Sequence, residues 1–320
     1  MDEILEGFER RDQAALARAI SLVENQRDGF ERVLAHAYAK LGKDRARRIG
    51  ITGPPGAGKS TLTERLIQQF RGGGGGVRVG VIAVDPTSPF TGGALLGDRI
   101  RMESTGPDPD VFIRSMATRG SHGGLATTTE EVADLLEAFG FERILIETVG
   151  VGQAELDIAA SADTTVLVLV PESGDAIQTL KAGVMEAADV YVINKSDRPG
   201  AEQLRHEVEG MLRMRPSDQW EPPVLGTVAT TGEGIGELVA ALERHYAYLQ
   251  GSGRLAAGRR NRLQRRLRAV VERAVRQWVW DATRAEELVA ERLDDVAAGR
   301  ESPYDVAAEI LQQLKSGAPG

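Results

Sequence analysis

Apolar residues recur with a helical period in the first part of the chain. Leu16, Ile20 and Val23 lie three or four residues apart, and similar spacing continues from Phe30 to Tyr38. This spacing places apolar side chains on one face of a helix. The polar stretch Asn25–Asp28 interrupts the pattern. Residues 1–45 are therefore predicted to form a helical extension of two helices.

From Arg47 onward, short β-rich runs alternate with helical stretches. The predicted strands are Arg48–Thr52, Val77–Val84, Val111–Arg114, Arg143–Glu147, Thr164–Val170, Val190–Ile193 and Val224–Thr227. Several runs are apolar at consecutive positions, which is expected for strands that are covered on both faces. The alternation predicts an α/β fold, a three-layer sandwich with a mainly parallel sheet and helical extensions at both ends.

The pattern changes again near Gln250. Gly251–Gly253 reads as a hinge, and only helical patterns follow, over about 255–281, 285–298 and from Pro303. The last start is well marked, because Ser302 can cap the helix and Asp305 lies three residues after the cap. We therefore divide the chain into a helical extension (1–45), an α/β domain (46–249) and a helical arm (250–320).

Composition narrows the functional classes. The 39 Lys and Arg residues against 47 Asp and Glu give a net charge of −8, which argues against nucleic-acid binding over the whole surface. The chain has no cysteine, which excludes disulfides and thiolate metal sites. The N-terminus is charged, and no apolar run approaches the roughly 20 residues that a membrane helix needs. We expect a cytoplasmic protein without a membrane partner.

The strongest motif directly follows the first predicted strand. It consists of Gly53, Pro54, Pro55, Gly56, Ala57, Gly58, Lys59 and Ser60, and Thr61 comes next. Such a loop wraps a phosphate chain with its backbone N–H groups, and the N-terminus of the following helix adds positive potential. Lys59 can reach the β- and γ-phosphates, and the Ser60 hydroxyl can bind Mg²⁺. These residues are the predicted phosphate site, and with them the predicted α/β sandwich is that of a P-loop NTPase.

A second motif indicates which base is bound. Asn194–Asp197 reads Asn-Lys-Ser-Asp and follows the apolar run Val190–Ile193. Asp197 can accept hydrogen bonds from the N1–H and 2-amino groups of guanine, whereas adenine offers no such pair. Val228–Thr230 could place a backbone N–H at the guanine O6. The predicted base-binding residues are Asn194, Lys195, Asp197, Val228 and Ala229, with GTP and GDP as the ligands.

Acidic residues lie at predicted strand ends or in adjacent loops. They are Asp85, Asp98 and Glu147. Ligands of open α/β folds bind at the carboxyl ends of the strands, and Mg²⁺ prefers carboxylate, water and phosphate oxygens. With Ser60 these acids form the predicted metal site, and with Lys59 the predicted catalytic set. Gly150 and Gln153 lie in a segment that could move with the γ-phosphate.

Together these motifs resemble the methylmalonyl-CoA mutase-associated GTPases of the MeaB/ArgK family. The matching segments are Arg18–Glu24, Gly53–Ser60, Asp85–Ser88, Gly92–Arg99, Met116–Gly120, Glu147–Gln153, Gly174–Lys181 and Asn194–Asp197. The resemblance implies a Mg²⁺-dependent GTPase that chaperones an adenosylcobalamin-dependent acyl-CoA mutase and gates cofactor loading, protection or rescue. It also implies an additional switch at Pro171–Lys181, with Asp175 and Lys181 as its charged members, and a homodimer through the C-terminal arm.

Three alternatives stay open. A nickel-insertion GTPase would need Cys or His ligands, and only His122 lies in a glycine-rich loop. An ATP-using kinase for arginine transport is disfavoured by Asn194–Asp197. The arm carries nine arginines between residues 254 and 276, with Glu272 as the only acid. This pattern is typical of the solvated face of an amphipathic helix, so nucleic acid is not an expected partner, and an RNA- or anion-binding arm is the alternative.

Overall fold

The computed structural model describes residues 1–42, 45–72, 76–86, 108–118, 124–148, 160–173, 184–214, 220–281 and 284–316. The chain divides into two compact units, residues 1–260 and 261–320. No helix within the described ranges is long and apolar enough to cross a membrane.

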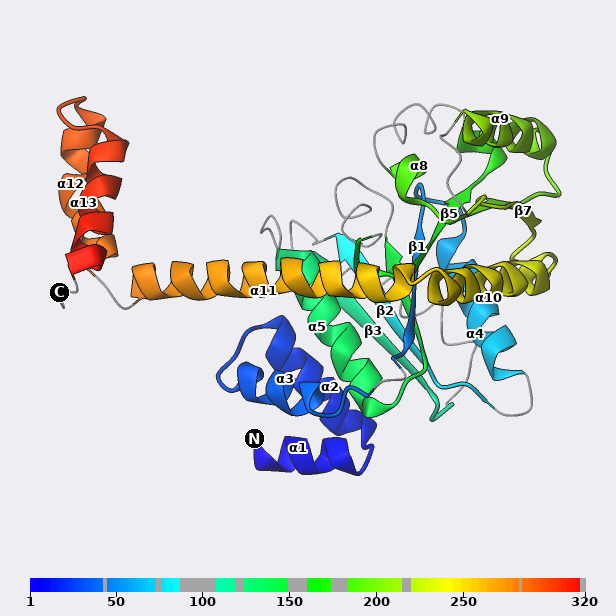
Figure 1. The fold of residues 1–320 in the computed structure, drawn as a ribbon, viewed down its shortest axis with the longest axis horizontal. Helices are drawn as coiled ribbons and strands as arrows, with labels where there is room; N and C mark the ends of the chain where they lie inside the picture. Colours follow the sequence, from blue (N-terminus) through cyan, green and yellow to red (C-terminus); the bar gives the residue numbers. More distant parts are fainter. Residues whose placement is uncertain are drawn as a thin grey trace. The chain divides into compact units, whose positions relative to one another are not determined.

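Seven parallel strands form one sheet in the first unit, in the order β3-β2-β4-β1-β5-β6-β7 (Figure 1). The strands are β1 (Arg47–Thr52), β2 (Val79–Pro86), β3 (Val111–Thr118), β4 (Arg143–Thr148), β5 (Thr164–Leu169), β6 (Val190–Asn194) and β7 (Val224–Thr227). Each predicted strand coincides with one of these, although β2 begins two residues later than predicted and β3 continues four residues further. The predicted α/β class is confirmed.

Neighbouring side chains of a strand face opposite layers of helices. Helices α4 (Lys59–Arg71) and α10 (Ile235–Gly251) cover one face of the sheet, where they pack against Leu145 of β4. The other face is covered by α5 (Gly124–Phe139), α8 (Val184–Ala187) and α9 (Ala201–Arg213). Ile144 and Ile146, the neighbours of Leu145, pack on this second side. The consecutive apolar positions of the strands are thus buried on both faces, which gives three layers.

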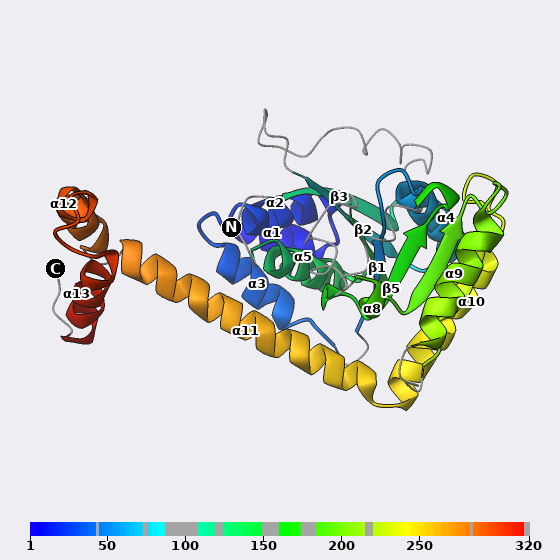
Figure 2. The ribbon, with the colours of Figure 1, turned by 90° about the horizontal axis from the view of Figure 1, so that it is seen from above.

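The N-terminal helices form an additional layer over α5 (Figure 2). They are α1 (Asp2–Glu9), α2 (Gln13–Glu24) and α3 (Phe30–Tyr38). Phe8, Leu16 and Ile20 share a buried core with Phe139 of α5. The prediction of two helices was wrong, because the chain breaks a second time before Gln13. Asp12 caps α2 there, since its side chain accepts a hydrogen bond from the backbone N–H of Ala14 at 2.9 Å.

The second unit contains most of the C-terminal helices. After α10 ends at Gly251, the chain continues as α11 (Arg254–Asp281), α12 (Ala285–Ala297) and α13 (Pro303–Ser316), and α11 begins in the first unit. Leu288 and Ile310 contribute to a small core of the second unit. Ser302 Oγ accepts a hydrogen bond from the Asp305 N–H at 3.2 Å, which confirms the predicted start of α13. The three-part division of the chain stays a prediction.

Candidate functional site

The predicted phosphate loop lies at the carboxyl edge of the sheet. It connects β1 to α4, and β1 pairs with β4 on one side and with β5 on the other. In this register Ile51 lies beside Glu147 of β4 and Val166 of β5. Asn194 is the last residue of β6. The carboxyl ends of three strands therefore bring the loop, Glu147 and Asn194 to one region, which is where ligands bind in open α/β folds.

Two glycines of the loop have conformations and surroundings that exclude a side chain. Gly53 has a φ of 140°, and a Cβ there would lie 2.0 Å from the carbonyl oxygen of Val168. Gly58 has a φ of 85°, and a Cβ would lie 2.4 Å from Nδ2 of Asn194. Both positions require glycine because other residues rarely adopt such φ values and would collide. The sequence pattern of the loop thus follows from its close approach to β5 and β6.

Lys59 is the buried cation of the loop. Its Nζ donates hydrogen bonds to the carbonyl oxygens of Gly53 at 2.7 Å and Pro54 at 3.0 Å. These backbone oxygens hold the amine at the loop, where an ammonium group can instead bind phosphate oxygens. Helix α4 begins at Lys59 without a side-chain cap, so the positive end of the helix points to the same place.

Glu147 joins β4 to the first two turns of α4. Its Oε1 accepts a hydrogen bond from Ser60 Oγ at 2.5 Å, and its Oε2 accepts one from Thr63 Oγ1 at 2.9 Å. Hydroxyl and carboxylate oxygens are ligands that Mg²⁺ prefers, so Ser60 and Glu147 fit a Mg²⁺ ion that is also bound by phosphates. Sequence reasoning missed Thr63. Its spacing of three residues from Ser60 on a helix was the available signal.

Asn194 connects the phosphate loop to the loop after β7. Its Nδ2 donates to the carbonyl oxygen of Ala57 at 2.8 Å, and its Oδ1 accepts from the backbone N–H of Ala229 at 3.1 Å. The next residue, Lys195, donates from Nζ to the carbonyl oxygen of Gly56 at 3.0 Å. Asp197 is exposed in the turn that follows. The two predicted motifs are therefore in direct contact, although they are about 140 residues apart.

The loop after β7 is already hydrogen-bonded within the protein. The Ala229 N–H donates to Asn194, and the Val228 N–H donates to the carbonyl oxygen of Glu233 at 3.1 Å. A guanine O6 would have to share or replace one of these bonds, so the roles of Val228 and Ala229 stay a prediction. Arg65 of α4, which sequence reasoning also missed, donates from Nε to the carbonyl oxygen of Ala229 at 2.8 Å.

Several predicted residues cannot be placed at the site. Asp85 lies at the carboxyl end of β2, but its side chain is outside the described part of the structure. The same holds for the whole of Asp98, Gly150, Gln153, Asp175 and Lys181. Among the described residues, no group of three or more His, Asp or Glu side chains forms a metal site.

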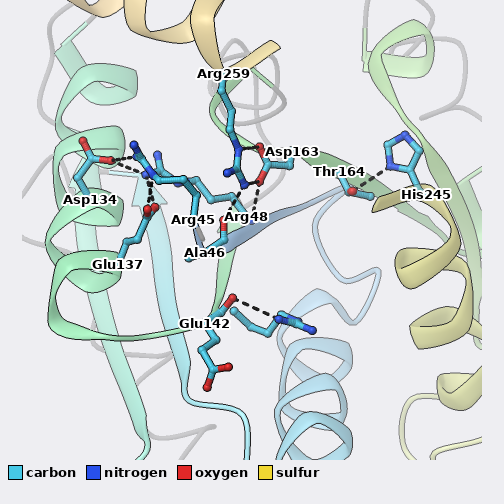
Figure 3. Close-up of polar contacts among 11 residues, drawn as sticks. Arg45, Ala46, Arg48, Asp134, Glu137, Glu142, Asp163, Thr164, His245 and Arg259 are labelled. Carbon is cyan, nitrogen blue, oxygen red and sulfur yellow. Dashed lines mark hydrogen bonds and ion pairs between the residues drawn. The ribbon is translucent and has the colours of Figure 1, made fainter. Parts of the chain in front are cut away.

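A second group of buried charges lies at the opposite, amino edge of the sheet (Figure 3). Arg48 at the start of β1 forms ion pairs with Asp134 and Glu137 of α5, the latter at 3.1 Å. Arg45 also pairs with these two carboxylates. Burial alone would lower the pKa of Arg48, but the charges of Asp134 and Glu137 raise it above its ordinary value. Arg48 therefore stays charged although it is buried.

Asp163 connects this network to the second turn of α11. The Arg259 guanidinium donates to both carboxylate oxygens of Asp163, at 3.1 and 2.7 Å, and to the carbonyl oxygen of Ala46 at 2.9 Å. Asp163 also accepts from the backbone N–H of Arg48 at 3.2 Å. We call the six residues Arg45, Arg48, Asp134, Glu137, Asp163 and Arg259 the amino-edge network (Figure 3). It contains three cations and three anions.

The parallel sheet and the glycine-rich loop that ends in Lys59 and Ser60 define a P-loop nucleoside triphosphatase. The sequence model of the family described as "Methylmalonyl Co-A mutase-associated GTPase MeaB" matches residues 16–284. The chain belongs to this family, and it is a GTP-hydrolysing enzyme. The resemblance that the motifs indicated is confirmed.

Individual relatives extend this comparison. A Pyrococcus abyssi protein with a provisional GTPase name is 46% identical over 322 residues, which cover 99% of this chain and 98% of the relative. The mouse protein named "Methylmalonic aciduria type A homolog, mitochondrial" is 39% identical over 81% of this chain and 66% of its own length. A crystal structure of a protein named LAO/AO transport system kinase has a TM-score of 0.70 and 28% identity, and covers 98% of this chain and 97% of that chain.

Proposed function

We propose that this GTPase acts on an adenosylcobalamin-dependent acyl-CoA mutase, either methylmalonyl-CoA mutase or a close relative, and that GTP hydrolysis gates loading, protection or rescue of the mutase cofactor. The observation that carries the proposal is the family match over residues 16–284, because the description of that family names the mutase. The name of the mouse relative, which refers to methylmalonic aciduria, supports the same partner.

The phosphate loop supplies the electrostatic part of the proposed catalysis. The backbone N–H groups of the loop glycines Gly53, Gly56 and Gly58 and the Lys59 amine would stabilise the negative charge that develops on the transferred phosphoryl group. Ser60 and Thr61 lie in the first turn of the helix whose positive end faces the same charge. Phosphate oxygens would take the place of the Gly53 and Pro54 carbonyl oxygens as partners of Lys59.

Ser60 and Glu147, with Asp85 and Asp98, are the proposed Mg²⁺-supporting residues. The bond between Ser60 and Glu147 supports this assignment because it places a hydroxyl and a carboxylate beside the phosphate loop. Bound Mg²⁺ would supply positive charge at the β- and γ-phosphates. Within this group Glu147 would also orient the attacking water by accepting its hydrogen bond.

Guanine recognition is assigned to Asp197, supported by Asn194, Lys195, Val228 and Ala229. The bonds from Asn194 to Ala57 and Ala229 support the proposal, because they hold the base-binding and phosphate-binding segments together. Replacing Asp197 with Asn should weaken GTP binding and relax selectivity. Unchanged GTP affinity would reject the role of this carboxylate.

The proposed switches continue from the two strands that flank β1. The segment with Gly150 and Gln153 follows β4, and the segment with Asp175 and Lys181 follows β5. A change at the γ-phosphate would therefore reach both segments through strands that neighbour the phosphate loop. This arrangement supports a mutase that senses the nucleotide state through the two segments.

The proposed homodimer would form through the C-terminal arm. Leu263, Leu267, Val271 and Val275 of α11 are spaced by four residues, and each is about half exposed. Trp278 continues this series and is 51% exposed. Side chains at this spacing lie along one face of a helix, and such an apolar stripe supports burial against a second copy of the arm. The cytoplasmic location stays a prediction.

A retention experiment tests the partner. The purified chain, loaded with GDP or with a nonhydrolysable GTP analogue, is presented with purified acyl-CoA mutases in their cobalamin-bound and cobalamin-free forms. We expect one mutase to be retained in a nucleotide-dependent way and to accelerate GTP hydrolysis. The Lys59→Met variant is the matched control and should lose the nucleotide dependence. Equal turnover with and without every mutase would contradict the proposed function.

A further inference from the structure

A residue outside the predicted motifs fixes the conformation of the loop after β7. Within the loop, the Val228 carbonyl oxygen accepts hydrogen bonds from the backbone N–H groups of Thr231 at 3.1 Å and Gly232 at 2.9 Å. These bonds hold the start of the turn. The peptide group between Ala229 and Thr230 takes no part in them, so its orientation depends on another contact.

Arg65 provides that contact from α4. Its Nε donates to the carbonyl oxygen of Ala229 at 2.8 Å, and its Nη2 donates to the carbonyl oxygen of Thr230 at 2.5 Å. The guanidinium is planar and donates from more than one nitrogen, so its two bonds to successive carbonyl oxygens fix the orientation of both peptide groups. A lysine side chain has only one nitrogen and would not fix both. Gln68, one turn later, accepts from Arg65 Nη1 at 2.9 Å and steadies the guanidinium.

The orientation of these carbonyls sets the direction of the N–H groups. A trans peptide is planar, and its C=O and N–H bonds point in opposite directions. Because the Ala229 carbonyl faces Arg65, the Thr230 N–H points away from α4. Thr230 is exposed, and its N–H has no acceptor among the described residues. A base oxygen can therefore approach the Thr230 N–H directly, whereas the Ala229 N–H would have to share its bond to Asn194.

We propose that Arg65 is a positioning residue for guanine recognition: it holds the Val228–Thr230 loop so that the backbone N–H groups of that loop meet the O6 of a guanine nucleotide. Arg65 does not touch the nucleotide. It lies on the helix that starts at Lys59, so the same rigid element positions the phosphate loop and the base loop. The inference rests on the proposed nucleotide site.

The test compares two nucleotides that differ at one atom. GDP and 6-thio-GDP share the N1–H and 2-amino groups, but 6-thio-GDP has a weakly accepting sulfur in place of O6. In the Arg65→Met variant we expect GDP affinity to fall about tenfold, the effect of about one lost hydrogen bond, while 6-thio-GDP affinity changes less than about twofold. Calorimetric titration of each protein in excess Mg²⁺ gives, for each nucleotide, the ratio of the affinity of the unmodified protein to that of the variant.

Two further variants separate positioning from folding. Arg65→Lys keeps the charge but replaces the planar guanidinium with a single ammonium nitrogen. It should therefore lose about threefold in GDP affinity, and again lose less in 6-thio-GDP affinity. Arg205→Met on α9 removes an exposed arginine that pairs with Glu209 at 3.0 Å, and it should leave both affinities unchanged. Thermal unfolding of each variant shows whether the fold is kept. If Arg65→Met does not fold, Arg65→Lys carries the comparison.

Each contrary result has a distinct meaning. Equal loss of GDP and 6-thio-GDP affinity in both Arg65 variants would overturn the positioning role and leave the nucleotide site intact. Unchanged GDP affinity in both variants would also overturn it. Failure of the unmodified protein to bind GDP would overturn the proposed nucleotide site itself, and with it the role of Arg65.

Discussion

Buried polar groups lie at both edges of the sheet, but they are bonded in different ways. At the amino edge, charges such as Arg48 and Asp134 pair with each other and join β1, α5 and α11. At the carboxyl edge, Lys59 donates to backbone carbonyl oxygens, and Glu147 accepts from hydroxyl groups. Bonds of the second kind can be exchanged for bonds to a phosphate or a metal ion. The comparison suggests that one edge holds the fold together and the other binds the ligand.

The largest effect is expected from breaking the amino-edge network. Arg48→Met leaves Asp134 and Glu137 buried with less compensating charge, and this should lower the free energy of unfolding by about 3–5 kcal/mol. The affinity of the folded fraction for GDP should stay within about twofold, because no residue of this network touches the phosphate loop. Urea unfolding gives the stability, and nucleotide titration gives the affinity.

An exposed ion pair supplies the control for this substitution. Arg205 is 45% exposed where it pairs with Glu209, so Arg205→Met should change stability by less than about 0.5 kcal/mol. The opposite result would be an Arg48→Met variant that keeps the stability of the unmodified protein and loses GDP binding. That result would contradict the roles given to the two edges, stability for the amino edge and ligand binding for the carboxyl edge.

The next largest effect is expected at Lys59. Lys59→Met removes the amine that would meet the phosphates, so kcat/KM for GTP should fall at least 100-fold, or about 2.7 kcal/mol of transition-state stabilisation. Its free energy of unfolding should fall less than that of Arg48→Met. Steady-state and single-turnover hydrolysis measure the loss of activity, and urea unfolding measures the free energy of unfolding. Hydrolysis at the unmodified rate would show that the carboxyl edge is not the catalytic site.

A smaller effect on stability, which depends on pH, is expected from the buried His245 at the amino edge. Burial lowers the pKa of His245 to about 4, although the charge of Asp163 acts in the opposite direction. Its Nδ1 shares a hydrogen bond with Thr164 Oγ1 at 2.9 Å, and Asp189 Oδ1 lies 3.4 Å from its Nε2 (Figure 3 shows the Thr164 contact). Because the folded pKa is below the unfolded value of about 6.5, the unfolded chain binds the proton first as the pH falls.

The stability that depends on neutral His245 is therefore complete above about pH 6.5 and is lost between about pH 6.5 and 4. Between pH 7 and pH 5 the loss should be about 2 kcal/mol. His245→Gln cannot take up this proton, so the pH dependence of its unfolding should be smaller by that amount. Urea unfolding at the two pH values measures it, and identical pH profiles for both proteins would contradict the buried, neutral histidine.

The sequence predicted the sheet well because each strand is encoded locally. The consecutive apolar residues of Val190–Ile193 need burial on both faces, whatever the neighbouring strands are. The phosphate loop is equally local, since glycines such as Gly53 are required by backbone conformation and by one close contact. The second break in the N-terminal helices had a local signal in Asp12, which the apolar period alone does not show.

Contacts between distant residues could not be predicted. Nothing near Arg65 in the sequence indicates that it meets Ala229, and nothing near Arg259 indicates Asp163. Such pairs depend on strand order and on where helices end, which hydrophobic patterning does not encode. The predicted roles of Asp98 and Gln153 depend on loops outside the described residues, so the structure does not test them.

The central claim is that the carboxyl edge is a guanine-nucleotide site, and competition between nucleotides tests it most directly. A fluorescent GDP bound to the purified chain in excess Mg²⁺ is displaced with GTP or with ATP. We predict that GTP displaces it at a concentration at least about 100-fold lower than ATP, and that Asp197→Asn narrows this ratio. Displacement by ATP at the same concentration as GTP would contradict the claim.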